Sequence, residues 1–191
     1  MLVYVSGGSG SGKSAFAESL IVQSGIKERT YIATMAPFGQ EGQIRIARHR
    51  ALRAGKGFTT IEKLRGLAEI EVPAGCAALL EDLTNLFANE WFGTEGKPGA
   101  PAQAAAQVLD GLCHLNDTAS LLVVVGNDLF SDGAEYDAEM MEYLRNLAAL
   151  NCAAAAMRWS AVSRSATKGT PILTKEHLRY EVCHHCLCHV L

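Results

Sequence analysis

A glycine-rich turn near the amino terminus constrains this chain more than any other feature. Residues 7–14 read Gly-Gly-Ser-Gly-Ser-Gly-Lys-Ser, which fits the pattern G-x-x-x-x-G-K-S. The turn follows the apolar run 2–6 and precedes a helical pattern over 15–20. A turn of this kind between a strand and a helix is called a P-loop. Its backbone N–H groups and the positive end of the following helix surround phosphates. We therefore expect a nucleotide-binding domain that holds a triphosphate.

The positions of the turn have separate roles. Lys13, a predicted catalytic residue, supplies positive charge to the outer phosphates, and the Ser14 hydroxyl is placed to ligate Mg²⁺. The turn specifies neither the base nor the acceptor, because kinases, GTPases and transport ATPases share it. The nucleotide-binding positions predicted here are Gly7, Gly8, Ser9, Gly10, Ser11, Gly12, Lys13 and Ser14.

Strand and helix patterns alternate along the chain and predict its fold class. The run 121–125 is apolar on consecutive residues, which is typical of a strand covered by helices on both faces. We expect an α/β, P-loop NTPase-like fold with a mostly parallel sheet covered by helices on both faces. The predicted strands are 2–6, 30–34, 58–61, 76–83, 120–126 and 159–163, and the predicted helices are 14–23, 43–53, 84–92, 102–115 and 135–157.

Length and charge limit the organisation and the partners. A chain of 191 residues suits one compact domain, so we assign 1–164 to the P-loop nucleotide-binding and transferase domain. Periodicity fades beyond Ser165, and 165–191 is predicted to be a divergent appendage rather than a separate domain. A net charge of −3 gives no general attraction to nucleic acid. With no secretory pattern and no apolar run near the roughly 20 residues of a membrane span, we expect a cytoplasmic protein.

The tail contains a candidate metal site. Its cysteines and histidines include a C-x-x-C pair and supply enough soft ligands for a structural zinc ion. No second ligand pair lies elsewhere in the sequence at zinc-finger spacing, so a variable or frayed tail is the alternative. The candidate zinc ligands are Cys183, Cys186, Cys188 and His189.

A basic segment is the second feature that indicates chemistry. Residues 43–53 carry four arginines and one histidine on about three turns of predicted helix. Arg45 and His49 lie one turn apart and can face the same ligand. Guanidinium groups bind phosphate bidentately, and a histidine beside them can attack an α-phosphate to form a phosphoramidate. The alternative is a solvated basic face whose histidine has no chemical role.

Taken together, these motifs resemble those of a known family. The turn 7–14, the run Tyr31–Thr34 and the segment Arg45–Arg50 with Glu62 downstream have the order and spacing of the bifunctional adenosylcobinamide kinase / adenosylcobinamide-phosphate guanylyltransferases. The likeness continues through 79–84 with Asn89 and more weakly through 125–128.

The resemblance implies a two-step activity in cobalamin biosynthesis. ATP or GTP would phosphorylate the aminopropanol hydroxyl of adenosylcobinamide, and GTP would then transfer GMP to that phosphate through a guanylated histidine. The resemblance also implies Mg²⁺ as cofactor, a corrinoid substrate and a homo-oligomer.

The same resemblance implies roles for particular residues. His49 matches the guanylated position, and Glu62 and Glu81 would contact guanosine or metal. A carboxylate can accept from the N–H edge of guanine or hold Mg²⁺ through water. The alternatives are a surface charge at Glu62 and a strand-end carboxylate at Glu81. The further nucleotide-binding positions implied are Tyr31, Ile32, Ala33, Thr34, Arg50, Ala51, Leu52 and Arg53.

Two other functions stay open on the sequence. The first is a P-loop kinase for another small alcohol, in which His49 is only a phosphate ligand. The second is a nucleotide-responsive binding module without turnover, whose tail mediates assembly or metal sensing. A covalent GMP adduct on His49 separates the guanylyltransferase from both.

Overall fold

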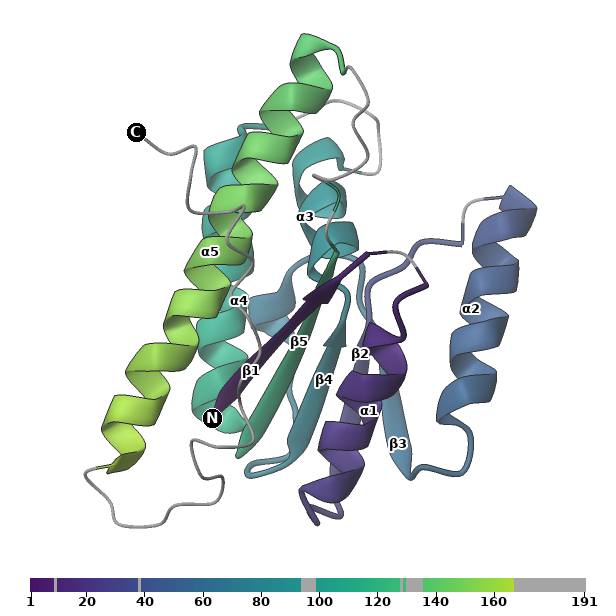
Figure 1. The fold of residues 1–191 in the computed structure, drawn as a ribbon, viewed down its shortest axis with the longest axis vertical. Helices are drawn as coiled ribbons and strands as arrows, with labels where there is room; N and C mark the ends of the chain where they lie inside the picture. Colours follow the sequence, from purple (N-terminus) through teal and green to yellow (C-terminus); the bar gives the residue numbers. More distant parts are fainter. Residues whose placement is uncertain (9, 38, 94–98, 128, 130–135, 167–191) are drawn as a thin grey trace.

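A parallel five-stranded sheet forms the centre of the protein (Figure 1). The computed structural model describes residues 1–8, 10–37, 39–93, 99–127, 129 and 136–166. The strand order is β1-β5-β4-β2-β3, and each neighbouring pair is parallel. The predicted parallel α/β sheet is therefore confirmed. The strands are β1 (Leu2–Gly7), β2 (Arg29–Ala33), β3 (Phe58–Glu62), β4 (Ala77–Glu81) and β5 (Leu121–Asn127).

Helices connect the strands, as parallel pairing requires. Asp82 caps one of them, α3, because its carboxylate accepts from the backbone N–H of Asn85 at 2.7 Å. Another, α4, begins at Pro101, whose ring fixes φ at a helical value and whose missing N–H costs nothing in the first turn. The helices are α1 (Lys13–Gln23), α2 (Gly39–Arg53), α3 (Leu83–Phe92), α4 (Pro101–Thr118) and α5 (Ala138–Ala166), with a 3₁₀ turn η1 (Leu67–Glu69).

Each face of the sheet has its own apolar core. On one face, Leu79 of β4 and Val123 of β5 pack with Ile21 of α1. On the other, alternate residues such as Leu80 and Val124 pack with α3, α4 and α5. Successive side chains of a strand point to opposite faces, so a run buried on both sides must be apolar throughout. Helices therefore cover both faces of the sheet, as predicted.

Helix α2 lies apart from this layered core (Figure 1). Among its residues only Arg53, the last, is buried. The apolar side chains Ile44 and Leu52 are 62% and 42% exposed. Contacts at its carboxyl-terminal end therefore do most to set the position of α2.

One predicted strand is wrong, and one boundary differs. Residues 159–163 belong to α5, which continues to Ala166, because good helix formers at 153–156 lead into them with no glycine or proline between. Strand β4 ends at Glu81, and Leu83 already begins α3. Most of the predicted appendage, residues 167–191, lies outside the described residues. Across the described helices, none is both long and apolar enough to cross a membrane.

Gly111 of α4 is a sensitive point of the core. A Cβ atom there would lie 2.5 Å from Cβ of Leu67 in η1, too close to be relieved by a rotamer change. We expect Gly111→Ala to lower the free energy of unfolding by up to about 2 kcal/mol, which is the overpacking penalty less the gain in helix propensity. Urea denaturation measures it. Gly42→Ala on α2 is the matched control, because its Cβ would meet the nearest atom at an ordinary 3.5 Å; equal stability of the two variants would contradict the prediction.

Candidate functional site

The glycine-rich turn joins β1 to α1 at the carboxyl edge of the sheet. Gly10 and Gly12 have φ of 74° and 83°, a left-handed conformation that favours glycine. The Lys13 ammonium donates to the carbonyl oxygen of Gly8 at 3.0 Å. This geometry folds the turn back over the start of α1, as in a phosphate-binding loop. Ser9, also predicted to bind nucleotide, lies outside the described residues.

Ser14 and Glu81 join the P-loop to the end of β4. The Ser14 hydroxyl donates to Oε1 of Glu81 at 2.6 Å. The other carboxylate oxygen, Oε2, is buried and has no hydrogen-bond partner among the described residues. A hydroxyl and a carboxylate with a free oxygen are hard donors that suit Mg²⁺. The chemistry of these two side chains therefore fits the predicted Mg²⁺, which Ser14 and Glu81 would hold.

Burial changes the acidity of the carboxylates at this edge. It raises the pKa of Glu81 to about 7, against the opposing hydrogen bond from Ser14. Burial likewise raises the pKa of Asp82, against its hydrogen bonds from Asn85 and Asn127. Two neighbouring buried carboxylates resist ionisation, and the charge of Lys13 opposes this only in part. A divalent ion bound here would relieve that resistance.

The raised pKa of Glu81 predicts a pH-dependent stability. In the unfolded chain Glu81 loses its proton near pH 4.5, whereas in the folded protein it keeps the proton to about pH 7. Between these values only the folded state holds the proton, so rising pH lowers stability. The total loss is about 3 kcal/mol, and it levels off above pH 7. We expect the Glu81→Gln variant to lack this contribution to the loss of stability with rising pH. Guanidinium denaturation of both proteins at pH 5, 6, 7 and 8 with EDTA measures it. Parallel wild-type and variant curves would contradict it.

A cavity lies between α2 and the carboxyl ends of β2, β3 and β4. Its volume is about 450 Å³, and both His49 and Glu81 line it. Because Glu81 also holds Ser14, the cavity adjoins the P-loop. We call it the α2 cavity. Its lining residues are Tyr31, Ala33, Met35, Pro37, Gln43, Ile46, Ala47, His49, Arg50, Arg53, Glu62, Leu64 and Glu81.

His49 is half-buried on the side of α2 that faces this cavity. Its Nδ1 atom is buried and has no hydrogen-bond partner within the described chain. Burial lowers the pKa of the imidazole, while the negative charges of Glu18 and Asp82 partly oppose the change. The ring is therefore neutral at physiological pH, which is the state in which a ring nitrogen is nucleophilic.

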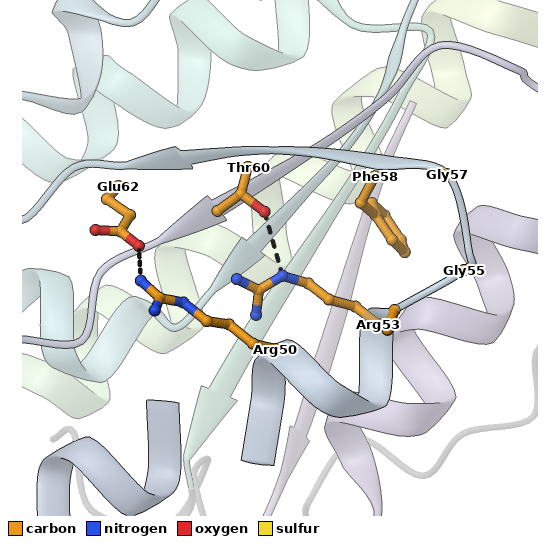
Figure 2. Close-up of a pocket in the computed structure, with 8 residues that line it drawn as sticks. Arg50, Arg53, Gly55, Gly57, Phe58, Thr60 and Glu62 are labelled. Carbon is orange, nitrogen blue, oxygen red and sulfur yellow. Dashed lines mark hydrogen bonds and ion pairs between the residues drawn. The ribbon is translucent and has the colours of Figure 1, made fainter. Parts of the chain in front are cut away.

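A groove of about 700 Å³ lies along edge strand β3 and shares Arg50, Arg53 and Glu62 with the α2 cavity (Figure 2). The Arg53 guanidinium lies 4.2 Å from the centre of the Tyr31 ring, and its Nε donates to Thr60 at 3.2 Å. Arg50 forms an ion pair with Glu62, in which both side chains are more than half exposed. Arginines at the border of cavity and groove make this end of the site electropositive.

Four predicted binding residues do not present their side chains to the cavity. Ile32 points to the opposite face of the sheet and joins the core there. The buried Thr34 hydroxyl is bonded to both backbone groups of Asp82, at 2.8 Å each. Ala51 and Leu52 are exposed and do not line the cavity.

Arg45 also lies away from the cavity. It pairs with Glu41 at 3.0 Å, and both side chains are exposed. The expectation that Arg45 and His49 share a ligand has no support in this arrangement, because only His49 faces the cavity.

Two charged residues near the site were not predicted from the sequence. Glu18 of α1 is 1% exposed and forms an ion pair with Lys56, in the turn between α2 and β3. Its position was detectable, because Glu18 lies on the apolar stripe of α1 with Ala17 and Ile21. An ionisable residue on such a stripe is a candidate for a buried, paired charge.

The predicted zinc ligands Cys183, Cys186, Cys188 and His189 lie outside the described residues. Within the part that the structure describes, no three His, Cys, Asp or Glu residues are placed to hold a metal ion together. The zinc site therefore stays a prediction.

Comparison with known proteins identifies the family. A comparison with curated protein sequences finds no match. Among solved structures, the flagellar accessory protein FlaH from Methanocaldococcus jannaschii aligns with a TM-score of 0.37 and 12% sequence identity, over 76% of this chain and 67% of that one. The family model for cobinamide kinase / cobinamide phosphate guanyltransferase matches residues 3–172, which include the P-loop, α2 and the sheet. The chain therefore belongs to the cobinamide kinase / cobinamide phosphate guanyltransferase family.

Proposed function

We propose that this chain phosphorylates adenosylcobinamide at its P-loop and then transfers GMP to the product through a covalent intermediate on His49. Its family makes it a bifunctional enzyme of cobalamin biosynthesis that acts on cobinamide with nucleoside triphosphates. The observation that carries the finer proposal is the shared cavity: His49 and Glu81 line it together, and Glu81 contacts Ser14 of the P-loop. One nucleotide site can therefore serve both reactions.

In the kinase step the P-loop holds the triphosphate of ATP or GTP. Backbone N–H groups of the turn and the start of α1 surround the phosphates, and Lys13 exchanges its bond to Gly8 for the outer phosphate oxygens. Mg²⁺ bound by Ser14 and Glu81 would neutralise charge on those oxygens. The oxygen of the corrinoid's aminopropanol hydroxyl then forms a bond to the γ-phosphorus as the bond to the β–γ bridging oxygen breaks. The nucleoside diphosphate leaves with that electron pair, and the hydroxyl proton passes to water.

In the guanylyl step His49 is the nucleophile. Because Nδ1 is buried, Nε2 is the nitrogen that reacts. Its lone pair forms a bond to the α-phosphorus of GTP, and the bond to the bridging oxygen breaks, so pyrophosphate leaves with the electron pair. A phosphate oxygen of adenosylcobinamide phosphate then attacks the same phosphorus and displaces the imidazole.

The arginines and Glu62 complete the proposed site. Arg50 and Arg53 border the cavity, where they can neutralise the α-phosphate that His49 attacks. Glu62 lies beside them at the mouth of the groove, where its carboxylate can accept from the N–H edge of guanine once Arg50 turns to phosphate. The homo-oligomer that the family resemblance implies is also part of the proposal, and light scattering tests it.

The test is direct detection of the adduct. The purified protein is incubated with Mg²⁺ and GTP labelled at the α-phosphate, and then denatured in alkali. We expect a base-stable, acid-labile label that peptide mass spectrometry places on His49, with phosphorus NMR assigning it to Nε2. A protein that binds GTP but takes up no label would refute the His49 intermediate and favour a kinase that uses His49 only as a ligand.

A further inference from the structure

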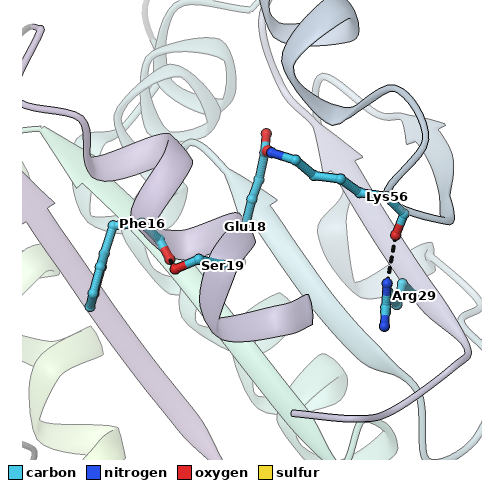
Figure 3. A network of polar contacts seen from close by, with 5 residues as sticks. All are labelled: Phe16, Glu18, Ser19, Arg29 and Lys56. Atoms are coloured by element: carbon cyan, nitrogen blue, oxygen red, sulfur yellow. Dashed lines mark hydrogen bonds and ion pairs between the residues drawn. The ribbon is translucent and has the colours of Figure 1, made fainter. Parts of the chain in front are cut away.

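Glu18 and Lys56 form a partly buried ion pair that the proposed chemistry does not use (Figure 3). Glu18 lies on α1 and is 1% exposed, whereas Lys56 is partly exposed in the turn between α2 and β3. Only one oxygen of Glu18 meets the ammonium; the other, Oε1, is buried without a hydrogen-bond partner among the described residues. Keeping a half-satisfied carboxylate in the protein interior is unfavourable compared with an apolar side chain.

The backbone of Lys56 is held as firmly as its side chain. Its carbonyl oxygen accepts from Nη1 of Arg29 at 2.7 Å, and Arg29 is itself fixed because its Nε donates to the Ile26 carbonyl at 2.9 Å. The N–H of Lys56 donates to the carbonyl oxygen of Arg53 at 3.1 Å, which extends the last turn of α2. Glu18 and Arg29 therefore tie the end of α2 to α1 and β2.

These ties act at the same end of α2 at which Arg50 and Arg53 contact β3 and Tyr31. The only buried residue of α2 is Arg53, which lies about one turn of helix beyond His49. Ile44 faces solvent, and His49 is only half-buried. A shift at the carboxyl-terminal end of α2 is therefore carried directly to the His49 ring.

We propose that Glu18 is a positioning residue for guanylyl transfer: by holding Lys56 it fixes the last turn of α2, from which His49 reaches the α2 cavity. This inference rests on the proposed role of His49. The charge of Glu18 is also the strongest charged influence on the His49 ring, so the two residues share one electrostatic environment. A misplacement of about 1 Å in a reacting group is enough to slow a reaction by as much as 100-fold.

The experiment separates the guanylyl step from the kinase step. We expect Glu18→Gln and Lys56→Met each to slow His49 labelling at saturating Mg²⁺ and GTP by about tenfold or more. Cobinamide phosphorylation should stay within about twofold of wild type, because neither residue contacts the P-loop. The double variant should be no slower than either single variant, and Lys56→Arg should retain labelling. Glu41→Gln, which breaks an exposed ion pair on the same helix, is the matched control and should label normally.

A second measurement does not depend on the chemistry of His49. Amide hydrogen exchange over residues 44–53 should accelerate in Glu18→Gln and not in Glu41→Gln. Normal labelling with unchanged exchange in Glu18→Gln would overturn the proposal, and so would an equal loss of both activities. If wild-type protein takes up no label, the His49 intermediate fails by itself, and the exchange comparison alone decides whether Glu18 fixes α2.

Discussion

Replacing His49 with alanine is expected to abolish GMP transfer and leave cobinamide phosphorylation nearly unchanged. Loss of the attacking nitrogen removes the covalent route, so we expect the rate to fall by roughly 10³-fold or more. The kinase step should persist, because the P-loop, Ser14 and Glu81 belong to other elements. The measurement follows GMP transfer from α-labelled GTP to adenosylcobinamide phosphate, beside phosphorylation of adenosylcobinamide.

Arg45→Ala is the matched control for His49→Ala. Arg45 lies one turn earlier on α2 and pairs only with exposed Glu41 in the described structure, so both activities should stay near wild type. GMP transfer by folded His49→Ala at the wild-type rate would contradict a histidine intermediate. Loss of both activities would contradict the separation of the two steps.

Lys13→Ala is expected to have the second large effect. The ammonium is the P-loop's point charge for the outer phosphates, and its removal should lower the kinase rate by roughly 10²-fold to 10³-fold. Labelling of His49 should also fall, because the same triphosphate must be held while its α-phosphorus is attacked. Initial rates over a range of Mg²⁺-ATP and Mg²⁺-GTP concentrations separate lost binding from lost rate.

Lys27→Ala provides the control, because it removes an exposed lysine beyond the end of α1. It should leave both steps unchanged. A Lys13→Ala protein that phosphorylates cobinamide normally would show that the P-loop is not the kinase site. Loss of the kinase step with full labelling of His49 would instead indicate that the two reactions use nucleotides bound at separate sites.

The sequence predicts the sheet well, because a run of consecutive apolar residues is compatible with few structures other than a strand buried on both faces. The run 121–125 can be buried only between two layers, and the structure places its alternate residues in two cores. The failure at 159–163 has the opposite cause. A short apolar run carries no period of its own, and its state was decided by the alanines that precede it in α5.

The site is predicted less completely, because motifs report spacing in the chain rather than direction in space. The motif locates Ser14, and the resemblance locates Glu81; the structure then joins them through a hydrogen bond. No pattern revealed that the Thr34 hydroxyl is engaged by Asp82, or that Lys56 meets Glu18 across 38 residues. Such contacts depend on how α1 and the turn after α2 pack, which no local signal encodes.

The hydrogen bonds of the P-loop bear on how the protein distinguishes one triphosphate from another. Lys13 bonds to Gly8 and Ser14 to Glu81, so the groups that would receive phosphate and Mg²⁺ already have internal partners. Nucleotide binding would then replace these internal hydrogen bonds with contacts to phosphate and Mg²⁺. The net free energy of binding from the phosphates is therefore smaller than the number of contacts suggests. Because every triphosphate would make the same exchange, we expect any preference for one base to arise elsewhere in the proposed site, where Arg53, Tyr31 and Glu62 line the cavity.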